Sequence, residues 1–367
     1  MINHQYFATF LTSPSYWGSV SDKSIGIALA NVNASKLKQI SMPLPPLPEQ
    51  HRIVAKIEEL FTKLDTGVEA LKKIQAQLKR YRQAVLKHAF EGMLTAEWPQ
   101  AHQGELEPAS ILLERIKQER RKTAKGKYKE LPPIDTSGLP QLPESWVWAR
   151  VGDITDLFSG KAFKKREYSD EGVRLFQIAN VSFVAVVWDS IAYMPVSYLQ
   201  KYPELALKAG DILMALNRPI LDGRLKIGEL NEKDAPSILY QRVGRFDFYD
   251  SSLKTFFFYF AQTPFFIDRL KASLQGVDQP FVTKPKLLKI PMPIASLAEQ
   301  HKIIEEVERR FSIADEIEKT IDYSLKQAER LRQSILKRAF EGKLVPQDPN
   351  DEPAEKLLEG IKAERAK

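Results

Sequence analysis

The chain repeats itself at a fixed distance of 250 residues. Residues 36–95 align without a gap on residues 286–345, and 24 of the 60 paired positions are identical. The same offset continues upstream, where Gly26 pairs with Gly276. A period this long indicates a duplicated unit that consists of a domain and a helix. The units of a solenoid are much shorter and recur about every 20–50 residues. The upstream part of the second copy is much longer than that of the first, so we expect two related but unequal units.

Composition limits the class of protein. The 367 residues leave room for two or three domains, and 43% hydrophobic with 28% charged residues is usual for a soluble globular chain. The absence of cysteine excludes disulfides and a thiol nucleophile. The N-terminus has no basic segment followed by an apolar one, and the most apolar run, 256–261, is too short to cross a bilayer. We expect a cytoplasmic protein that does not enter a membrane.

The net charge of +7 suggests nucleic acid as a partner, but this inference depends on where in the sequence the charged residues lie. Residues 115–130 hold eight Lys or Arg against two Glu, whereas residues 141–285 hold eighteen against seventeen Asp or Glu. The excess is therefore concentrated in a polar linker. Such a run either contacts phosphates or stays solvated.

Two long helices are predicted at equivalent places in the repeat. Pro48 and Glu49 suit a first helical turn, and apolar residues then recur at spacings of three, four or seven up to Phe90, before Gly92. The second helix extends from Leu297 to Gly342 with the same pattern. A helix of this kind is about 65 Å long. Its single apolar stripe needs a partner, so either the two helices pack antiparallel on each other or each lies on its own globular domain.

The remainder predicts an α+β protein with a β-rich domain. A short helix is expected at Ala109–Arg120, and a proline-rich joint follows at 131–143. A helix at Leu253–Leu274 should break near Pro264, and its many Phe residues should be core. Val, Ile, Phe and Tyr content predicts strands at Val173–Ile178, Val184–Trp188, Asp211–Leu216, Leu225–Leu230 and Leu239–Phe246.

Motifs for catalysis are absent from the sequence. There is no GxxxxGK[ST] phosphate loop, no GxGxxG at a helix start, no HExxH, and no DPPY-like tetrapeptide of the amino-methyltransferases. The five histidines have no metal-binding spacing. His51 and His301 occupy equivalent places in the repeat, which favours a packing or docking role. We therefore expect a binding protein with no catalytic residue and no metal site.

Several motifs together resemble one family. These are LPPLPEQHRIVAKIEELF from Leu44, SLAEQHKIIEEVERRF from Ser296, the AFEG-x-L helix endings, LPESWVWARVGDI from Leu142 and EKLLEGIKAERAK from Glu355. The chain resembles the specificity subunits of type I restriction–modification systems along nearly its whole length. The resemblance implies two target-recognition domains, each of which reads one half of a split double-stranded DNA sequence, and two antiparallel helices that set the gap between the halves.

The resemblance also implies partners and a division of the chain. Modification (methyltransferase) subunits would dock on the helices and a restriction/translocase subunit would join the complex. S-adenosylmethionine, ATP and Mg would reside in those subunits, so no cofactor is expected in this chain. The expected segments are a remnant of a first recognition domain, a spacer helix, a basic linker with a short helix, a complete recognition domain, a second spacer helix and a tail, at residues 1–43, 44–95, 96–143, 144–296, 297–345 and 346–367.

The chain departs from the family pattern at its start. Roughly the first hundred residues of a first recognition domain have no counterpart before residue 6, judged against the second copy. We therefore expect the aromatics Tyr6, Phe7, Phe10, Tyr16 and Trp17 to lack the sheet that they normally cover. The missing domain would come from a second copy or from a separate polypeptide. The alternative function is a truncated scaffold or decoy that binds the modification subunits without reading DNA.

Candidate site residues follow from these expectations. Basic residues after the first turn of the β-rich domain are candidates for phosphate contacts, and Arg, Asn and Gln between strands for base edges, because they grip guanine or adenine bidentately. The DNA candidates are Lys161, Lys164, Lys165, Arg166, Gln177, Asn180, Asn217, Arg218, Arg224, Gln241, Arg242 and Gln275. The candidates for docking partner subunits are Glu49, Gln50, His51, Phe61, Phe90, Glu299, Gln300, His301, Phe311 and Phe340.

Overall fold

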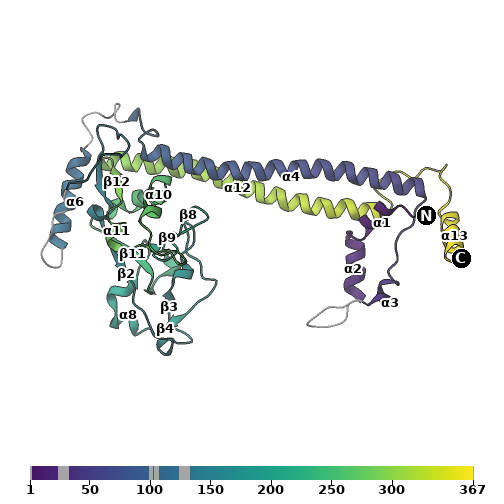
Figure 1. The fold of residues 1–367 in the computed structure, drawn as a ribbon, viewed down its shortest axis with the longest axis horizontal. Coiled ribbons are helices and arrows are strands. Elements are labelled where there is room, and N and C mark those ends of the chain that lie inside the picture. The colour runs from purple at the N-terminus through teal and green to yellow at the C-terminus, as the bar shows by residue number, and fades with distance from the viewer. Residues whose placement is uncertain (1, 24–32, 99–101, 103–106, 124–132, 367) are drawn as a thin grey trace. The chain divides into compact units, whose positions relative to one another are not determined.

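The structure, a computed structural model, describes residues 2–23, 33–98, 102, 107–123 and 133–366. The chain, drawn as a ribbon in Figure 1, divides into two compact units. Unit 1 consists of Met1–Lys79 and Ala314–Lys367, and unit 2 consists of Arg80–Ile313. Both long helices contribute one part to each unit.

The internal repeat is visible in the order of the helices. In the first copy α1 (His4–Phe10), α2 (Pro14–Lys23), α3 (Ala34–Leu37) and α4 (Leu47–Phe90) follow one another. In the second copy α9 (Lys254–Phe260), α10 (Pro264–Ser273), α11 (Lys284–Leu287) and α12 (Leu297–Phe340) do the same. Each helix begins 250 residues after its equivalent, so the repeat extends through the upstream helices. The remaining long helices are α6 (Ala109–Thr123) and α13 (Ala354–Arg365).

The ends of α4 and α12 are fixed in the same way. Each helix has 44 residues, and the predicted starts and ends are confirmed to within a residue or two. The Nε2 of Gln50 donates to the carbonyl of Pro45 at 2.9 Å, and Gln300 donates to Ala295 at 2.9 Å. At the other end Gly92 and Gly342 have φ of 76° and 70°, a left-handed conformation that terminates a helix and that glycine adopts without strain.

The two long helices pack antiparallel on each other within each unit, as predicted. In unit 1 a small hydrophobic cluster joins Leu78 of α4 to Ala314 and Ile321 of α12. Gln75 donates to Asp322, and Arg332 pairs with Asp65, so early residues of one helix face late residues of the other. In unit 2 the guanidinium of Arg82 lies 5.4 Å from the ring centroid of Phe311. The alternative that each helix lies on a separate domain is therefore wrong.

Unit 2 contains a β-rich domain, which we define as residues 147–294. Its main sheet has the strand order β2-β11-β6-β9, in which all neighbours are antiparallel. A second sheet has the order β4-β3-β10-β5, with β3 and β10 parallel, and two pairs, β1-β12 and β7-β8, complete it. The strands are β1 Val147–Arg150, β2 Thr155–Ser159, β3 Val173–Phe176, β4 Tyr193–Met194, β5 Ala206–Leu207, β6 Ile212–Ala215, β7 Ile220–Leu221, β8 Arg224–Leu225, β9 Ile227–Glu229, β10 Ser237–Leu239, β11 Val243–Phe248 and β12 Pro291–Ile294.

The strand predictions were partly wrong. The segment predicted as one strand at Leu239–Phe246 forms β10 and β11, which belong to different sheets. The chain turns between them at Arg242, whose φ of 67° is incompatible with a continuous strand. Val184–Trp188 forms no strand, and Val184 itself has a φ of 59°. The strands β3, β6 and β9 lie within predicted ranges, and the α+β class is confirmed.

The aromatic helices of the second copy form the core beside the main sheet. Phe256, Phe257, Phe260 and Phe266 are at most 1% exposed, which confirms them as core residues. The ring of Phe257 packs on Phe246 of β11 at a centroid distance of 4.7 Å. The end of α4 joins this core, because the Phe90 ring lies 4.8 Å from Phe256 and 5.3 Å from Phe260. As predicted, the helix breaks before Pro264, into α9 and α10.

Unit 1 repeats this arrangement with the other long helix. The Phe340 ring, at the end of α12, lies 5.2 Å from Tyr6 and 5.2 Å from Phe10 on α1. The described residues of unit 1 form no strand, as expected, but Phe340 covers Tyr6 and Phe10, which are 1% and 3% exposed. Phe7 and Trp17 are 47% and 59% exposed, and Tyr16 is half-buried.

No helix within the described ranges is long and apolar enough to cross a membrane.

The packing of Phe340 on α1 predicts how substitutions in α12 change the stability of the fold. We expect Phe340→Ala to lower the free energy of unfolding by about 3–5 kcal/mol, because a buried ring is lost between two others. Tyr323→Ala, at a side chain of α12 that is 64% exposed, should change it by less than about 0.5 kcal/mol. Urea unfolding followed by helical circular dichroism measures both variants. Equal effects at the two positions would contradict the packing.

Candidate nucleic-acid interface

The ends of several strands meet at one edge of the main sheet. Because β2 and β6 both run antiparallel to β11, the carboxyl ends of β2 and β6 lie beside the amino end of β11. The Gln241 amide donates to the carbonyl of Lys161 at 3.1 Å, and Leu216 donates to Arg242 at 2.8 Å. This places Lys161, Gln241 and Arg242 at the same edge. Loops at such an edge are held by a rigid scaffold and are suited to binding.

A second loop joins this edge. Asn217 and Gln275 both form bridges with Phe281, and the Arg218 amide donates to the carbonyl of Pro280 at 2.6 Å. The structure therefore brings together predicted residues that lie far apart in the sequence. We call this set, with Arg224 from β8 beside it, the strand-end surface: Lys161, Asn217, Arg218, Arg224, Gln241, Arg242 and Gln275.

Two arginines of this surface have a left-handed backbone. The φ of Arg218 is 45° and that of Arg242 is 67°, values that cost free energy in a residue with a side chain. Both residues are exposed; Arg242 directly precedes β11, and Arg218 lies in the loop between β6 and β7. Strain of this kind is retained where the surrounding structure or a function requires the side chain in one direction.

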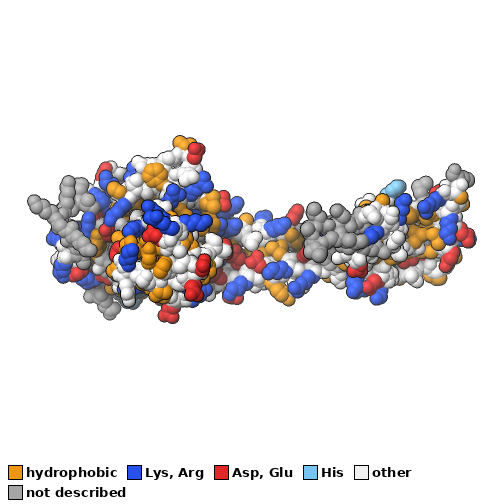
Figure 2. Space-filling model, turned by 90° about the horizontal axis from the view of Figure 1, so that it is seen from below, with side chains coloured by type: hydrophobic (Ala, Val, Ile, Leu, Met, Phe, Trp, Pro, Cys, Tyr) orange, Lys and Arg blue, Asp and Glu red, His pale blue; other side chains and the backbone are white. Residues whose placement is uncertain are grey.

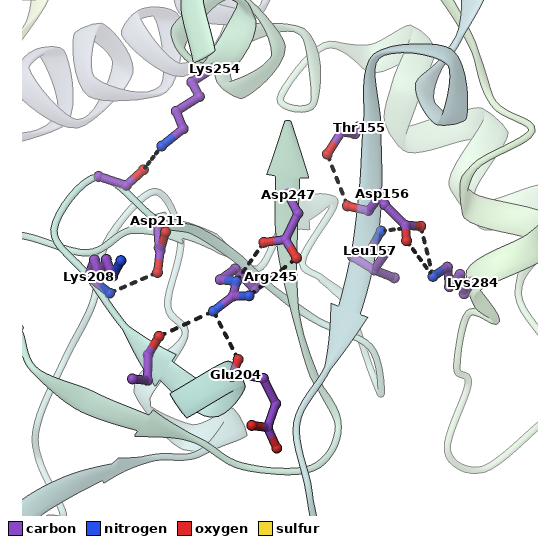
Figure 3. Close-up of polar contacts among 12 residues, drawn as sticks. Thr155, Asp156, Leu157, Glu204, Lys208, Asp211, Arg245, Asp247, Lys254 and Lys284 are labelled. Atoms are coloured by element: carbon purple, nitrogen blue, oxygen red, sulfur yellow. Dashed lines mark hydrogen bonds and ion pairs between the residues drawn. The ribbon is translucent and has the colours of Figure 1, made fainter. Parts of the chain in front are cut away.

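Four cations at this edge have no carboxylate partner. Among the described residues, no carboxylate forms an ion pair with Lys161, Arg218, Arg224 or Arg242. Elsewhere on the domain some basic side chains are paired, such as Arg245 with Asp247 at 2.7 Å and Lys284 with Asp156 at 2.7 Å (Figure 3), and others are not. The positive charge of the strand-end surface is thus not balanced by carboxylates, which suits an anionic ligand such as a phosphate.

Aromatic rings support several of these cations. The Lys161 Nζ lies 4.2 Å from the centroid of Tyr202, and the Arg224 guanidinium 3.8 Å from that of Phe183. The nearby charge of Lys161, through its bond to the hydroxyl, lowers the pKa of Tyr202. Figure 2 shows Lys and Arg side chains bordering a hydrophobic patch on one face of this domain. Tyr202 and Phe183 were not predicted from the sequence, because a cation–aromatic pair between distant segments leaves no local pattern.

The other residues predicted to contact DNA differ in how exposed their side chains are. Lys164, Lys165 and Arg166 are exposed in and before the short 3-10 helix η1 (Lys165–Glu167). Gln177 is half-buried after β3. Asn180 is only 2% exposed, and its amide binds the carbonyls of Val187 and Ser190. Asn180 therefore holds a turn together, and we remove it from the candidates for base contacts.

Most of the residues predicted to dock partner subunits have side chains that are buried within the fold. Six are at most 6% exposed, and they pack or cap the helices: Glu49, Gln50, Phe90, Glu299, Gln300 and Phe340. Phe61 and Phe311 are half-buried beneath the arginines Arg332 and Arg82. Only His51 and His301 of this set are exposed. Identity between the two copies therefore reflects shared internal packing more than a shared outer surface.

Glu299 shows what one of these buried residues does. Its carboxylate accepts hydrogen bonds from the Thr95 hydroxyl at 2.9 Å and from the Trp146 indole Nε1 at 2.9 Å. Trp146 directly precedes β1, so the contact ties α12 to the first strand of the β-rich domain. Burial raises the pKa of Glu299 above its usual value, and the two hydrogen bonds oppose this shift.

The raised pKa of Glu299 predicts a pH dependence. A carboxyl whose pKa is higher in the folded state favours folding fully below its unfolded pKa of 4.5, and this contribution is lost as the pH rises through the folded pKa. We expect the stability difference, wild type minus Glu299→Gln, to decrease over that range, since glutamine does not titrate. Urea unfolding at a series of pH values measures it. Parallel curves for wild type and variant would show that Glu299 does not titrate abnormally.

The chain thus combines a β-rich domain, an antiparallel pair of long helices and a basic strand-end surface. The family model of the type I restriction modification DNA specificity domain matches residues 2–80 and 143–327. The chain belongs to this family of type I specificity subunits.

Relatives and solved structures agree. The specificity subunit of the type I restriction enzyme MjaVIII of Methanocaldococcus jannaschii is 33% identical over 320 residues, which are 87% of this chain and 65% of that protein. The EcoAI specificity subunit of Escherichia coli is 26% identical and is covered over 59% of its length. The chain therefore spans less than two thirds of these relatives.

Two solved structures show the same fold. A chain from a structural study of complex assembly and conformational transition of the type I R-M system aligns with a TM-score of 0.67, at 18% identity, over 93% of this chain and 72% of its own length. The HsdS subunit from Thermoanaerobacter tengcongensis aligns with a TM-score of 0.53, at 19% identity, over 92% of this chain and 70% of its own.

Proposed function

We propose that this chain is a DNA sequence-specificity subunit of a type I restriction–modification complex and reads one half of a bipartite DNA target. The observation that carries this proposal is the strand-end surface, on which cations without carboxylate partners stand beside Asn and Gln side chains. Cations without partners bind phosphates, while Arg, Asn and Gln can distinguish base edges. Family membership supports the same function.

The chemistry of the complex would reside in other subunits. The sequence has no phosphate loop and no methyltransferase tetrapeptide, and the described residues include no group of side chains that could hold a metal ion. Methyltransferase subunits would supply S-adenosylmethionine, and a restriction/translocase subunit would supply ATP and Mg. This chain is proposed as a non-catalytic subunit in the cytoplasm.

The exposed faces of the long helices are the proposed docking surface for the methyltransferase subunits. His51 and His301 are exposed at equivalent positions, one turn inside each helix. A pair of equivalent surfaces suits two copies of one partner, because equal surfaces bind equal ligands. The antiparallel helix pair would also fix the distance between two half-sites.

DNA reading by the strand-end surface is tested by substitution. We expect Arg242→Ala to weaken binding of the reconstituted complex to its target by about 1–3 kcal/mol and to relax the preference for one base. Lys271→Ala is a matched control, because it removes an exposed cation of the same domain that pairs with Asp268. Fluorescence anisotropy with target and scrambled duplexes measures both variants.

A phosphate contact should behave differently from a base contact. Lys165→Ala should weaken binding to target and scrambled DNA alike, and should reduce the slope of log K against log salt by about one.

The two other variants decide whether the strand-end surface reads DNA. If Arg242→Ala and Lys271→Ala have equal effects on binding to the target, the strand-end surface does not read DNA.

Methylation mapping tests the function as a whole. Co-expression of this chain with modification subunits, followed by sequencing of methylated adenines, should give a split target sequence that is absent without this chain. The second half-site requires a second recognition domain. An interrupted palindrome would indicate a second copy of the same domain, and an asymmetric site a different domain. No methylation in any combination would favour the scaffold or decoy function.

A further inference from the structure

A cavity lies in unit 2 between the loop that precedes β1 and residues of β1, α10 and β12. Its volume is about 440 Å³, which is within the range of pockets that hold small organic ligands. Three of the side chains that line it are cations: Arg150, Arg269 and Lys289. None of its lining residues belongs to the strand-end surface, so it is a separate feature, which we call the basic cavity.

The fold brings these three cations together from distant parts of the sequence. Arg150 is the last residue of β1 and lies opposite Pro291, the first residue of β12. Lys289 precedes Pro291 by two residues, and Arg269 stands on α10. Arg269 and Lys289 are exposed, while Arg150 is half-buried. The basic cavity therefore exists only in the folded chain, and a ligand can reach its cations from solvent.

No carboxylate neutralises these charges. Among the residues that the structure describes, none forms an ion pair with any of the three cations. The Arg150 guanidinium donates to the carbonyl of Pro133 at 3.0 Å, and the Arg269 guanidinium lies 5.2 Å from the ring centroid of Phe265. These contacts orient the two guanidinium groups and leave their charges in place. Like charges around one cavity repel each other, so a bound anion relieves an unfavourable interaction.

Two carboxylates beside the basic cavity have other partners. Asp153 accepts from the Arg150 backbone N–H at 2.8 Å and pairs with Arg120 at 3.2 Å. Asp135 lines the cavity and accepts from the Ser137 backbone N–H at 2.9 Å. Hydrogen bonds from Ser137 hold the pKa of Asp135 below its usual value, so this carboxylate is charged at neutral pH. Three cations against one carboxylate leave the lining with a net charge of +2.

The internal repeat indicates that the packing shared by the two copies does not need these cations. The equivalents of Arg269 and Lys289 in the first copy are Ser19 and Gln39, which are neutral. By contrast, the glutamines that fix the starts of α4 and α12 are identical in the two copies and buried. The two exposed charges are thus specific to the second copy, which favours a binding role for them over a structural one.

We infer that the basic cavity binds a phosphate group through Arg150, Arg269 and Lys289. A guanidinium presents a fork of N–H donors that fits phosphate oxygens bidentately, and an ammonium adds a compact charge. A phosphate monoester has a charge of about −1.5 to −2 at pH 7 and three acceptor oxygens. These properties match a lining with three cations and a net charge of +2 better than the single charge of a carboxylate does.

The phosphate group can come from two sources. The apolar part of the lining consists of Ile134, Leu139 and Pro291, against which the organic group of a phosphate ester can pack. One source is a free phosphate ester of small size, such as a mononucleotide. The other source is a phosphodiester of double-stranded DNA, and only this source rests on the proposed function.

The test titrates the full chain with inorganic phosphate, without DNA, by isothermal titration calorimetry in a buffer that contains chloride as the other anion. We expect saturable binding of one phosphate per chain. The double variant Arg269→Gln with Lys289→Gln should bind phosphate about tenfold more weakly or worse, because it loses two charged donors. Lys289→Arg alone keeps the charge and should bind about as the wild type does.

A matched control uses the same helix. Lys271→Gln removes an exposed cation of α10 that does not line the cavity and that pairs with Asp268, so it should leave phosphate binding unchanged. Circular dichroism of each variant checks that the fold is intact. Equal binding of phosphate by the wild type and the double variant overturns the inference.

A second measurement identifies the source of the phosphate. Binding of the reconstituted complex to a scrambled duplex is measured over a series of salt concentrations, for the wild type, the double variant and Lys271→Gln. If the double variant alone reduces the slope of log K against log salt by about one, the phosphate belongs to DNA. An unchanged slope with weakened binding of inorganic phosphate assigns the cavity to a free phosphate ester. No binding of inorganic phosphate together with an unchanged slope overturns the inference, whatever the outcome for target reading by Arg242.

Discussion

The structure depends on one interaction that occurs twice, the packing of a phenylalanine at the end of each long helix against the aromatic helices of the other copy. Phe90 ends the first long helix and packs on Phe256 and Phe260 of the second copy. Phe340 ends the second long helix and packs on Tyr6 and Phe10 of the first. Each contact joins segments that are far apart in the sequence. Only an antiparallel helix pair satisfies both contacts, because each helix must end where the other begins.

The packing within the copies determines where a ligand can bind. The residues that recur in both copies, such as Gln50 and Gln300, are used to fix the starts of helices and are buried. Chemistry that differs between proteins of this architecture must lie elsewhere, on loops that the core does not constrain. The strand-end surface has this property: most of its side chains stand outside the strands, and β6 beside them is buried throughout. On the proposed function, a scaffold fixed by its core and binding residues placed on loops would let one fold read different sequences.

The sequence was sufficient to predict the helices and insufficient for the sheets. Proline, capping residues and a regular apolar spacing are local signals, and they placed both ends of α4 and α12 within a residue or two. The turn at Arg242 has no such signal, because its left-handed backbone is imposed by the neighbouring strands. The same limit applied to the candidate site. Loop position identified Arg218 and Gln275, but only the folded chain shows that Asn180 is buried and that Glu299 binds an indole.

The equal length of the two long helices constrains how such a protein can change. One inserted residue turns all following side chains by about 100° and removes the apolar stripe from its partner, whereas seven inserted residues nearly restore it. In an antiparallel pair an insertion in one helix requires a matching insertion in the other, or one of the two phenylalanine ends loses its contact. A change of length that keeps both the apolar stripe and the phenylalanine contacts therefore requires matched insertions in the two helices, and a matched insertion of seven residues lengthens each helix by about 10 Å.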